Sequence, residues 1–244
     1  MWSSIQQIIK PESIHATLGL LENEGSTLFS GGTYLVGQKD RQIHTLVDIN
    51  HLINSDVMTQ DNDLHIGSGC TLQQLTQTED DLLGKSILAS CPSKNIRNQR
   101  TIGGEIAQAR SNSDLMVYLM AASALIQKND SLDTEMLSDW DGSGVITKLV
   151  IPKNKVQLER VSVLDSAPAF VIVGMDHSKQ DVSIAIGGKT TQILVHHTQH
   201  EPDEGEIRAF LERVGGIFQN DHFGSADYKT HLVSNILMAM AVSS

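Results

Sequence analysis

Two short loops contain paired glycines next to hydroxyl side chains. The first reads Ser30-Gly31-Gly32-Thr33 and the second reads Thr101-Ile102-Gly103-Gly104. Because glycine has no Cβ, its backbone N–H groups can converge on an anion that a side chain would block, and the threonine hydroxyls add further donors. A helical turn after each loop would add a favourable dipole. The two loops together predict a site for a ligand that carries two phosphates.

Other glycine motifs exclude two common nucleotide-binding folds. Gly187-Gly188-Lys189-Thr190 ends like the phosphate-binding loop of an NTPase, but Ser183 stands where that motif requires its first glycine. Gly67-Ser68-Gly69 has Leu72 where a Rossmann dinucleotide fingerprint requires glycine. We therefore interpret Gly187-Gly188 as a hairpin turn.

Composition excludes several classes of partner and location. The 244 residues carry a net charge of −11, and nucleic-acid affinity depends on clustered Lys and Arg, so we expect no nucleic-acid partner. No stretch approaches the roughly 20 apolar residues that cross a bilayer, and Met1 to Lys10 lacks the layout of a secretion signal, so we expect a cytoplasmic protein that does not enter a membrane. Cys70 and Cys91 are too few to hold an iron–sulfur cluster, and we expect two partly buried thiols.

Hydrophobic patterning predicts a mixed architecture. A helix begins after Pro11 and ends before Gly25, and an apolar helix over 114–124 follows the second glycine loop. Five apolar runs predict an antiparallel sheet, and two helices close the chain. The predicted strands are 145–151, 157–164, 169–175, 182–186 and 192–196, and the predicted final helices are 203–214 and 226–242. Polar residues at 152–155 place a domain boundary there.

The sequence around the glycine loops resembles the FAD-binding subunits and domains of the molybdenum hydroxylase family, which includes xanthine dehydrogenases and carbon monoxide dehydrogenases. The resemblance extends over nearly the whole chain. It rests on Pro11-Glu12-Ser13, Ser30 to Leu35, Leu46 to Ile49, Ile66 to Gly69, the block Ile96-Arg97-Asn98-Gln99-Arg100-Thr101-Ile102-Gly103-Gly104, Ser113-Asp114, Ile184 to Gly188 and Ser225 to Tyr228.

This resemblance implies an α+β fold. An FAD-binding domain of two α+β subdomains, of the PCMH/VAO-like type, would span 1–153, and a smaller domain of antiparallel strands and helices would span 154–244. The implied contacts with the FAD pyrophosphate are Ser30, Gly31, Gly32, Thr33, Tyr34, Leu35, Thr101, Ile102, Gly103, Gly104 and Glu105. Asp114 would bond the cofactor further along, and Ile146 would contact its adenine side.

The resemblance also implies an oxidoreductase subunit that is incomplete alone. FAD would receive electrons from a 2Fe-2S iron–sulfur subunit and pass them to an acceptor such as NAD⁺, while the substrate is oxidised on a molybdopterin subunit. We expect no catalytic side chain and no metal site here, because His196, His197 and His200 lack acidic or cysteine ligands at a recognisable spacing. The alternatives are a stand-alone FAD oxidoreductase and a flavin-free assembly or regulatory protein that retains the fold.

Two loop residues depart from the family pattern. The family usually has Asp or Asn at Tyr34 and Asn at Glu105. A carboxylate beside a pyrophosphate is repelled unless it turns away, is protonated or meets a cation, and Arg97 and Arg110 are candidate cations. Arg160 falls near a position where the family has a basic cofactor contact. We expect Glu105→Asn to bind FAD more tightly, and Gly32→Val or Gly103→Val to abolish binding without unfolding the chain.

Overall fold

The computed structural model describes residues 2–153, 155–164, 167–177, 182–200 and 204–242. Its helices and strands confirm the predicted α+β class. Contacts divide the chain into two interleaved units. Unit 1 comprises Met1–Gln77, Ser93–Gln108 and Leu125–Val150, and unit 2 comprises Thr78–Pro92, Ala109–Ala124 and Ile151–Ser244. The predicted boundary between 153 and 154 falls at a residue outside the described ranges and stays a prediction.

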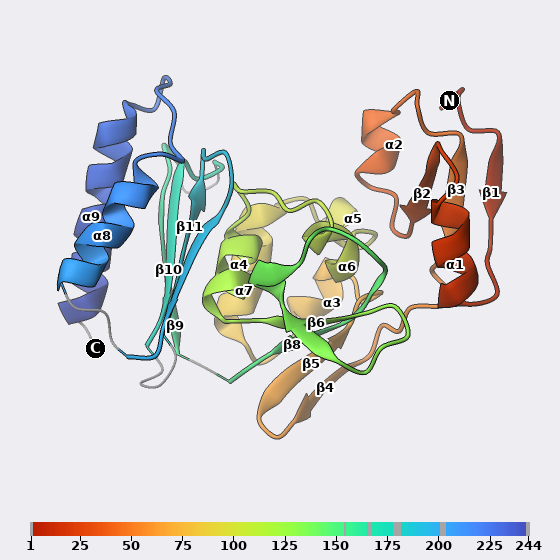
Figure 1. Cartoon of the computed structure of the whole chain (residues 1–244), viewed down its shortest axis with the longest axis horizontal. Helices are drawn as coiled ribbons and strands as arrows, with labels where there is room; N and C mark the ends of the chain where they lie inside the picture. The colour runs from red at the N-terminus through yellow and green to blue at the C-terminus, as the bar shows by residue number, and fades with distance from the viewer. Residues whose placement is uncertain (1, 154, 165–166, 178–181, 201–203, 243–244) are drawn as a thin grey trace. The chain divides into compact units, whose positions relative to one another are not determined.

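The N-terminal part of unit 1 is a small parallel sheet with a helix against it (Figure 1). The strand order is β1-β3-β2, and α1 contacts β2 and β3. Ser13 caps α1 by accepting a hydrogen bond from the Ala16 N–H, as expected for a hydroxyl residue before a helix. The bounds are β1 (Gln7–Ile9), α1 (Ile14–Leu21), β2 (Ser26–Phe29), α2 (Leu35–Gln38) and β3 (Thr45–Asp48). The strand β2 therefore runs directly into the first glycine loop.

The second part of unit 1 is a five-stranded sheet accompanied by short helices. The strand order is β4-β5-β8-β6-β7. The strands are β4 (Val57–Gln60), β5 (Asp63–Gly67), β6 (Leu125–Lys128), β7 (Thr134–Met136) and β8 (Ile146–Ile151), and the helices are α3 (Leu72–Leu75), α5 (Lys94–Arg97), α6 (Ile102–Ile106) and the 3₁₀ turn η1 (Leu137–Asp139). The N–H groups of Ile102 and Gly103 donate to the carbonyls of Cys70 and Ser68, which fastens α6 to the loop after β5. Cys70 and Cys91 are free thiols, as expected, and both are buried.

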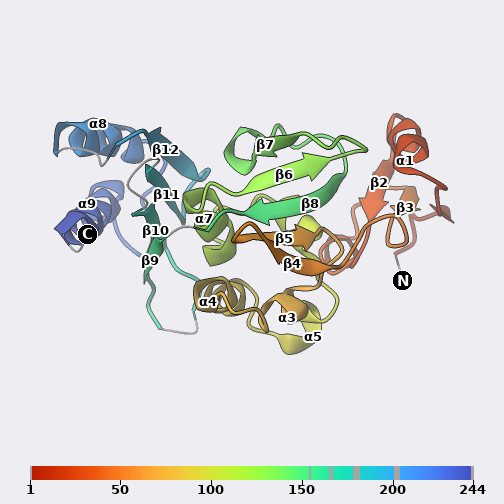
Figure 2. The same cartoon turned by 90° about the horizontal axis from the view of Figure 1, so that it is seen from below.

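Unit 2 contains an antiparallel sheet of four of the five predicted strands, with strand order β12-β11-β10-β9. The placement of the fifth, 145–151, in this sheet is wrong, because that segment forms β8, which pairs with β6 in the sheet of unit 1. Its elements are α4 (Asp81–Ser90), α7 (Asp114–Ala121), β9 (Val156–Val161), β10 (Val171–Asp176), β11 (Val182–Gly188), β12 (Leu194–Thr198), α8 (Glu204–Val214) and α9 (Ala226–Val242). Figures 1 and 2 show α8 and α9 side by side against the sheet. The predicted start of α8 at 203 lies outside the described residues.

Both faces of this sheet are buried, which explains the continuous apolar sequence of β10 and β11. Val173 and Ile184 belong to the core that includes Phe210 of α8 and Leu237 of α9. Ile172 and Ala185 pack in a second cluster with Val117 and Ala121 of α7. Almost every residue of α7 is buried, as expected for a helix that is hydrophobic all round.

The interpretation of Gly187-Gly188 as a hairpin turn is wrong. Both residues end strand β11, where Gly188 pairs with Val171 and Gly187 pairs with Ile172. A Cβ on Gly187 would lie 2.5 Å from the Ser111 carbonyl oxygen, and the Gly188 N–H donates to that same carbonyl at 2.7 Å. The two glycines therefore allow the segment before α7 to approach the strand closely.

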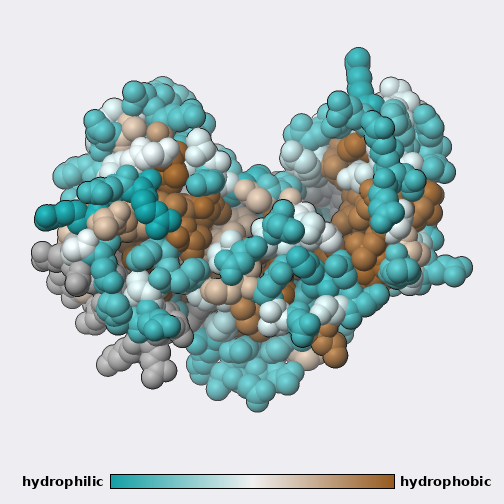
Figure 3. All heavy atoms as spheres, viewed as in Figure 1, coloured by the Kyte–Doolittle hydropathy of each residue, from teal (hydrophilic) through white to brown (hydrophobic). Residues whose placement is uncertain are grey.

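No helix in the described ranges is long and apolar enough to cross a membrane. Figure 3 shows apolar side chains gathered on the surface of unit 1 around α1, β2 and α2, next to polar surface. This apolar area borders the site described below.

Candidate functional site

Unit 1 encloses a cavity of about 500 Å³, within the range typical of small-molecule sites. Three segments form most of its wall. The first is the end of β2 with the glycine loop after it, the second is the loop from Arg100 through α6 to Gln108, and the third is the turn from Trp140 to Ile146. In that turn Gly142 and Gly144 have φ of +83° and +82°, a conformation that favours glycine. The cavity thus joins segments that are far apart in the sequence.

Most of the predicted contact residues line this cavity. They are Ser30, Gly31, Gly32, Thr33, Tyr34, Leu35, Thr101, Gly103, Gly104 and Ile146. Ile102 is fully buried in the core beneath the loop. The Glu105 side chain is also fully buried, and Asp114 belongs to unit 2, where its carboxylate pairs with Arg160. The contact of each residue with a cofactor stays a prediction.

The first glycine loop presents unpaired hydrogen-bond donors at the cavity wall. Within the described ranges the N–H groups of Gly31, Gly32 and Thr33 donate to no protein acceptor. Gly32 has a φ of +66°, and a Cβ on Gly31 would lie 1.9 Å from the Gln99 carbonyl oxygen, so the backbone path requires glycine at both positions. Three successive unpaired N–H groups form a concave site for an anion. The loop is therefore suited to an anion, and its contact with phosphate stays a prediction.

The second glycine loop has a different role from the one its sequence suggests. The N–H groups of Ile102, Gly103 and Gly104 donate to the Cys70 carbonyl, the Ser68 carbonyl and the Thr101 hydroxyl. A Cβ on Gly103 would lie 2.9 Å from the Ser68 Cβ. These three N–H groups are already paired within the protein. The glycines of this loop allow its close packing against Ser68, and they also line the cavity without a side chain.

The structure gives Glu105 a cation that the sequence did not suggest, Arg100. Arg100 Nη1 lies 3.1 Å from Glu105 Oε2, and Arg100 Nε donates to the Thr33 hydroxyl at 3.1 Å. Arg97 Nε donates to the Gln73 amide oxygen, and Arg110 belongs to unit 2. That either of these arginines meets Glu105 stays a prediction. Arg160 also belongs to unit 2, as the partner of Asp114.

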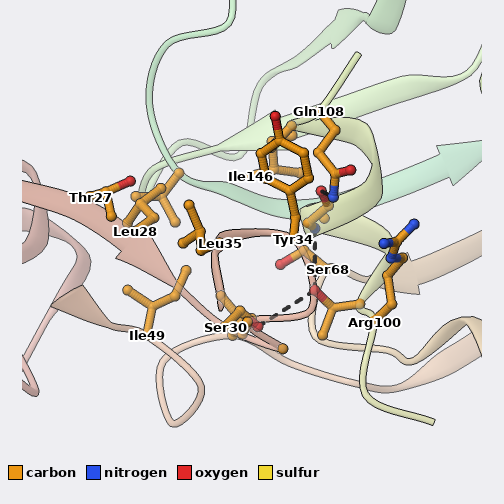
Figure 4. A pocket seen from close by; sticks show the side chains of 18 of the residues that line it. Thr27, Leu28, Ser30, Tyr34, Leu35, Ile49, Ser68, Arg100, Gln108 and Ile146 are labelled. Carbon is orange, nitrogen blue, oxygen red and sulfur yellow. Dashed lines mark hydrogen bonds between the residues drawn. The ribbon is translucent and has the colours of Figure 1, made fainter. Parts of the chain in front are cut away.

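Two buried polar atoms on the cavity wall have no hydrogen-bond partner in the described residues. They are the Ser68 hydroxyl oxygen and the Gln108 amide oxygen Oε1. Buried polar groups are nearly always paired in folded proteins, so such atoms indicate a bound ligand or water. Figure 4 shows Ser68, Gln108 and Arg100 on one side of the pocket, with Leu28, Leu35 and Ile49 on the other. The wall is therefore suited to a ligand with both polar and apolar parts.

Tyr34 stands between these two sides in Figure 4 and is 44% exposed. Its ring provides a flat apolar surface with a polar tip at the cavity. Sequence reasoning named Tyr34 both as an implied cofactor contact and as a departure from the family loop. It missed Ser68, Arg100 and Gln108 as site residues. A charged side chain directly before the Thr101-Ile102-Gly103-Gly104 loop is the signal that could have identified Arg100.

Comparison with known families identifies the family of the chain. Residues 3–140, more than half of the chain, match the model described as the FAD binding domain in molybdopterin dehydrogenase. The chain belongs to this family. It is accordingly an FAD-binding component of an oxidoreductase, and the unpaired donors, the cation and the apolar wall fit a cofactor with a diphosphate and an aromatic ring system.

Relatives and solved structures match over almost their full length. The uncharacterized protein YgfM of Escherichia coli K12 is 26% identical over 96% of this chain and 94% of its own length. A reconstituted CO dehydrogenase from Oligotropha carboxidovorans matches with a TM-score of 0.73 at 16% identity, covering 98% of this chain and 96% of the matched chain. Quinoline 2-oxidoreductase from Pseudomonas putida 86 matches with a TM-score of 0.68 at 17% identity, over 98% and 96%. At these identities the structural matches show a shared fold.

Proposed function

We propose that the chain is the FAD-binding, electron-transferring subunit of a molybdenum hydroxylase of the xanthine dehydrogenase type, acting in the cytoplasm. In the assembled enzyme it would receive electrons from a 2Fe-2S subunit and deliver them to an acceptor such as NAD⁺, while a molybdopterin subunit oxidises the substrate. The similar chains of known fold include parts of a CO dehydrogenase and a quinoline oxidoreductase, both of which act on small molecules by oxidation.

The observation that carries this proposal is the cavity of unit 1. Its polar side joins the three unpaired N–H groups of Gly31 to Thr33 with the guanidinium of Arg100. Its apolar side consists of Leu28, Leu35 and Ile49. A dinucleotide with charged phosphates and flat rings requires both kinds of wall.

The chain's own residues bind and orient the cofactor. Bound FAD supplies redox chemistry in one-electron and two-electron steps, which the protein side chains cannot supply. Thr33 accepts a hydrogen bond from Arg100, so its own hydroxyl hydrogen remains free to donate into the cavity. Ser30 and Thr101, whose hydroxyl oxygens are 3.5 Å apart, join the two loops. The apolar wall excludes water from one side of the site.

Three measurements on the purified full chain test the proposal. A flavin absorption spectrum after incubation with FAD tests binding, and absence of binding would support a flavin-free assembly role. Bleaching of that spectrum by NADH under anaerobic conditions tests the acceptor half-reaction run in reverse. Purification of the tagged chain from cells that also express candidate molybdopterin and iron–sulfur subunits tests assembly. Hydroxylation of a substrate by this chain alone would contradict the subunit role.

A further inference from the structure

Among the described residues that line the cavity, Arg100 is the only one with a formal charge. Its side chain is 13% exposed, and two protein acceptors fix its guanidinium: the Thr33 hydroxyl and the Glu105 carboxylate. Nη2 donates to no protein acceptor within the described ranges. A fixed guanidinium with one nitrogen left for a ligand is suited to phosphate, which arginine recognises by directional, paired hydrogen bonds.

The buried ion pair between Arg100 and Glu105 is not explained by a gain in folding stability. Glu105 is fully buried, and moving a carboxylate out of water costs several kcal/mol, so a buried ion pair is often no more stable than packed hydrophobic residues. Glu105 does not line the cavity, and its carboxylate forms an ion pair with Arg100, which does. Its geometric effect is to hold the guanidinium beside the loop with the unpaired N–H groups, because Thr33 of that loop binds the same guanidinium.

We propose that Arg100 recognises the diphosphate of the bound dinucleotide, and that Glu105 and Thr33 are positioning residues for it. This inference rests on the proposed function, since it assigns the cation within that cofactor site. The Gly31 to Thr33 N–H groups supply neutral donors and Arg100 supplies the charge. Arg100 thereby compensates at the site for a protein whose net charge of −11 opposes an anionic cofactor.

The decisive variant is the double substitution Arg100→Gln/Glu105→Gln. It removes one positive and one negative charge, so the net charge stays at −11 and the buried carboxylate is not left without its cation. The matched control is Arg41→Gln, an exposed arginine of unit 1 outside the cavity wall. FAD binding is measured by quenching of flavin fluorescence at several salt concentrations, and urea unfolding without FAD establishes that each variant is folded.

The double variant should bind FAD about ten- to hundredfold more weakly than wild type, the loss expected for one charge-assisted hydrogen-bonding group. Its affinity should also depend less on salt, because one charge contact with the phosphates is gone. Arg41→Gln should bind within about twofold of wild type. A folded double variant with wild-type affinity and salt dependence would overturn the inference.

Arg100→Lys carries the test if the double variant does not fold. Lysine keeps the charge beside Glu105 but lacks the planar fork, so binding should still weaken by about tenfold. Wild-type affinity in Arg100→Lys would overturn the assignment of a directional contact. Failure of wild type itself to bind FAD would instead refute the proposed function.

Discussion

Arg160 Nε lies 2.9 Å from Asp114 Oδ2, and the Asp114 side chain is almost completely buried at the start of α7. Burial raises the pKa of the Asp114 carboxyl above its ordinary value, although the charge of Arg160 and its hydrogen bond act in the opposite direction. The cost of desolvation is therefore the larger effect, and the ion pair offsets only part of it. The folded state therefore favours the neutral form of the Asp114 carboxyl group over its charged form.

This relationship predicts an unusual pH dependence. Because the folded pKa of Asp114 exceeds the unfolded value of about 3.9, its contribution to stability is largest below that pH and declines as pH rises through the folded pKa. The free energy of unfolding of wild type minus that of Asp114→Asn should therefore fall from about pH 4 upward. Urea unfolding at successive pH values measures it, with Asp81→Asn on α4 as the control for loss of one exposed charge. A difference that rises with pH would contradict the argument.

For His196 we expect the opposite pH dependence of stability, at a pH closer to neutrality. It lies on β12 with its ring stacked 5.1 Å from that of Phe210, and its Nε2 is buried without a hydrogen-bond partner in the described residues. Burial, followed by the charge of Arg213, lowers the pKa of His196. Its stabilising contribution is therefore complete above the unfolded pKa of about 6.5 and is lost as pH falls toward the folded value.

The test is His196→Phe, which keeps an aromatic ring against Phe210 and removes the titration. We expect the melting temperature of wild type to decrease more steeply than that of the variant between about pH 6.5 and 5. Calorimetric melting at matched ionic strength measures both. Equal pH slopes of the melting temperature in wild type and variant would show that the His196 ring titrates alike in the folded and unfolded states.

The packing of Gly103 corrects the expectation that Gly103→Val leaves the fold intact. A Cβ there would lie 2.9 Å from the Ser68 Cβ and 3.1 Å from the Ser68 carbonyl oxygen. Because that oxygen belongs to the backbone, it cannot easily move away from an added methyl group. Even Gly103→Ala should lower the free energy of unfolding by about 1–3 kcal/mol without any FAD present. Gly19→Ala in α1 is the matched control, since open space surrounds that site, and it should stabilise by about 0.5–1 kcal/mol. Equal stability of the two variants would refute the packing argument.

Much of the fold was predictable because burial leaves a clear pattern in the sequence. The apolar runs of β10 and β11 and the terminal helices follow from it. The short strands β1, β4, β6 and β7 were missed. In the β4–β5 hairpin, the turn residues Asp61 and Asn62 have positive φ without any glycine to signal it. Strands of three or four residues also carry too few positions to establish a period of two.

The site was predictable in its glycines and not in its charges. Both loops line the cavity, yet sequence reasoning treated their N–H groups alike. The difference arises from the carbonyls of Ser68 and Cys70, which pair with the second loop and are supplied by a segment about thirty residues earlier. The Arg100–Glu105 pair likewise depends on side-chain direction around one turn of α6, which spacing alone does not determine.

Glu105→Gln separates the charge of Glu105 from its positioning effect. The sequence suggested Glu105→Asn, but asparagine is one methylene shorter and the structure gives Glu105 a partner to reach, Arg100. Glutamine keeps the length and an acceptor for the guanidinium while it removes the negative charge. At an effective dielectric near 20, a unit charge about 10 Å from a phosphate contributes roughly 1.7 kcal/mol, so FAD should bind up to about twentyfold more tightly at low salt. Glu105→Ala, which leaves Arg100 without that acceptor, should bind FAD more weakly than Glu105→Gln.

Isothermal titration calorimetry at low and high salt measures both variants, and the gain in Glu105→Gln should shrink as salt screens the charge. Equal affinities for the glutamine and alanine variants would show that Glu105 does not position Arg100.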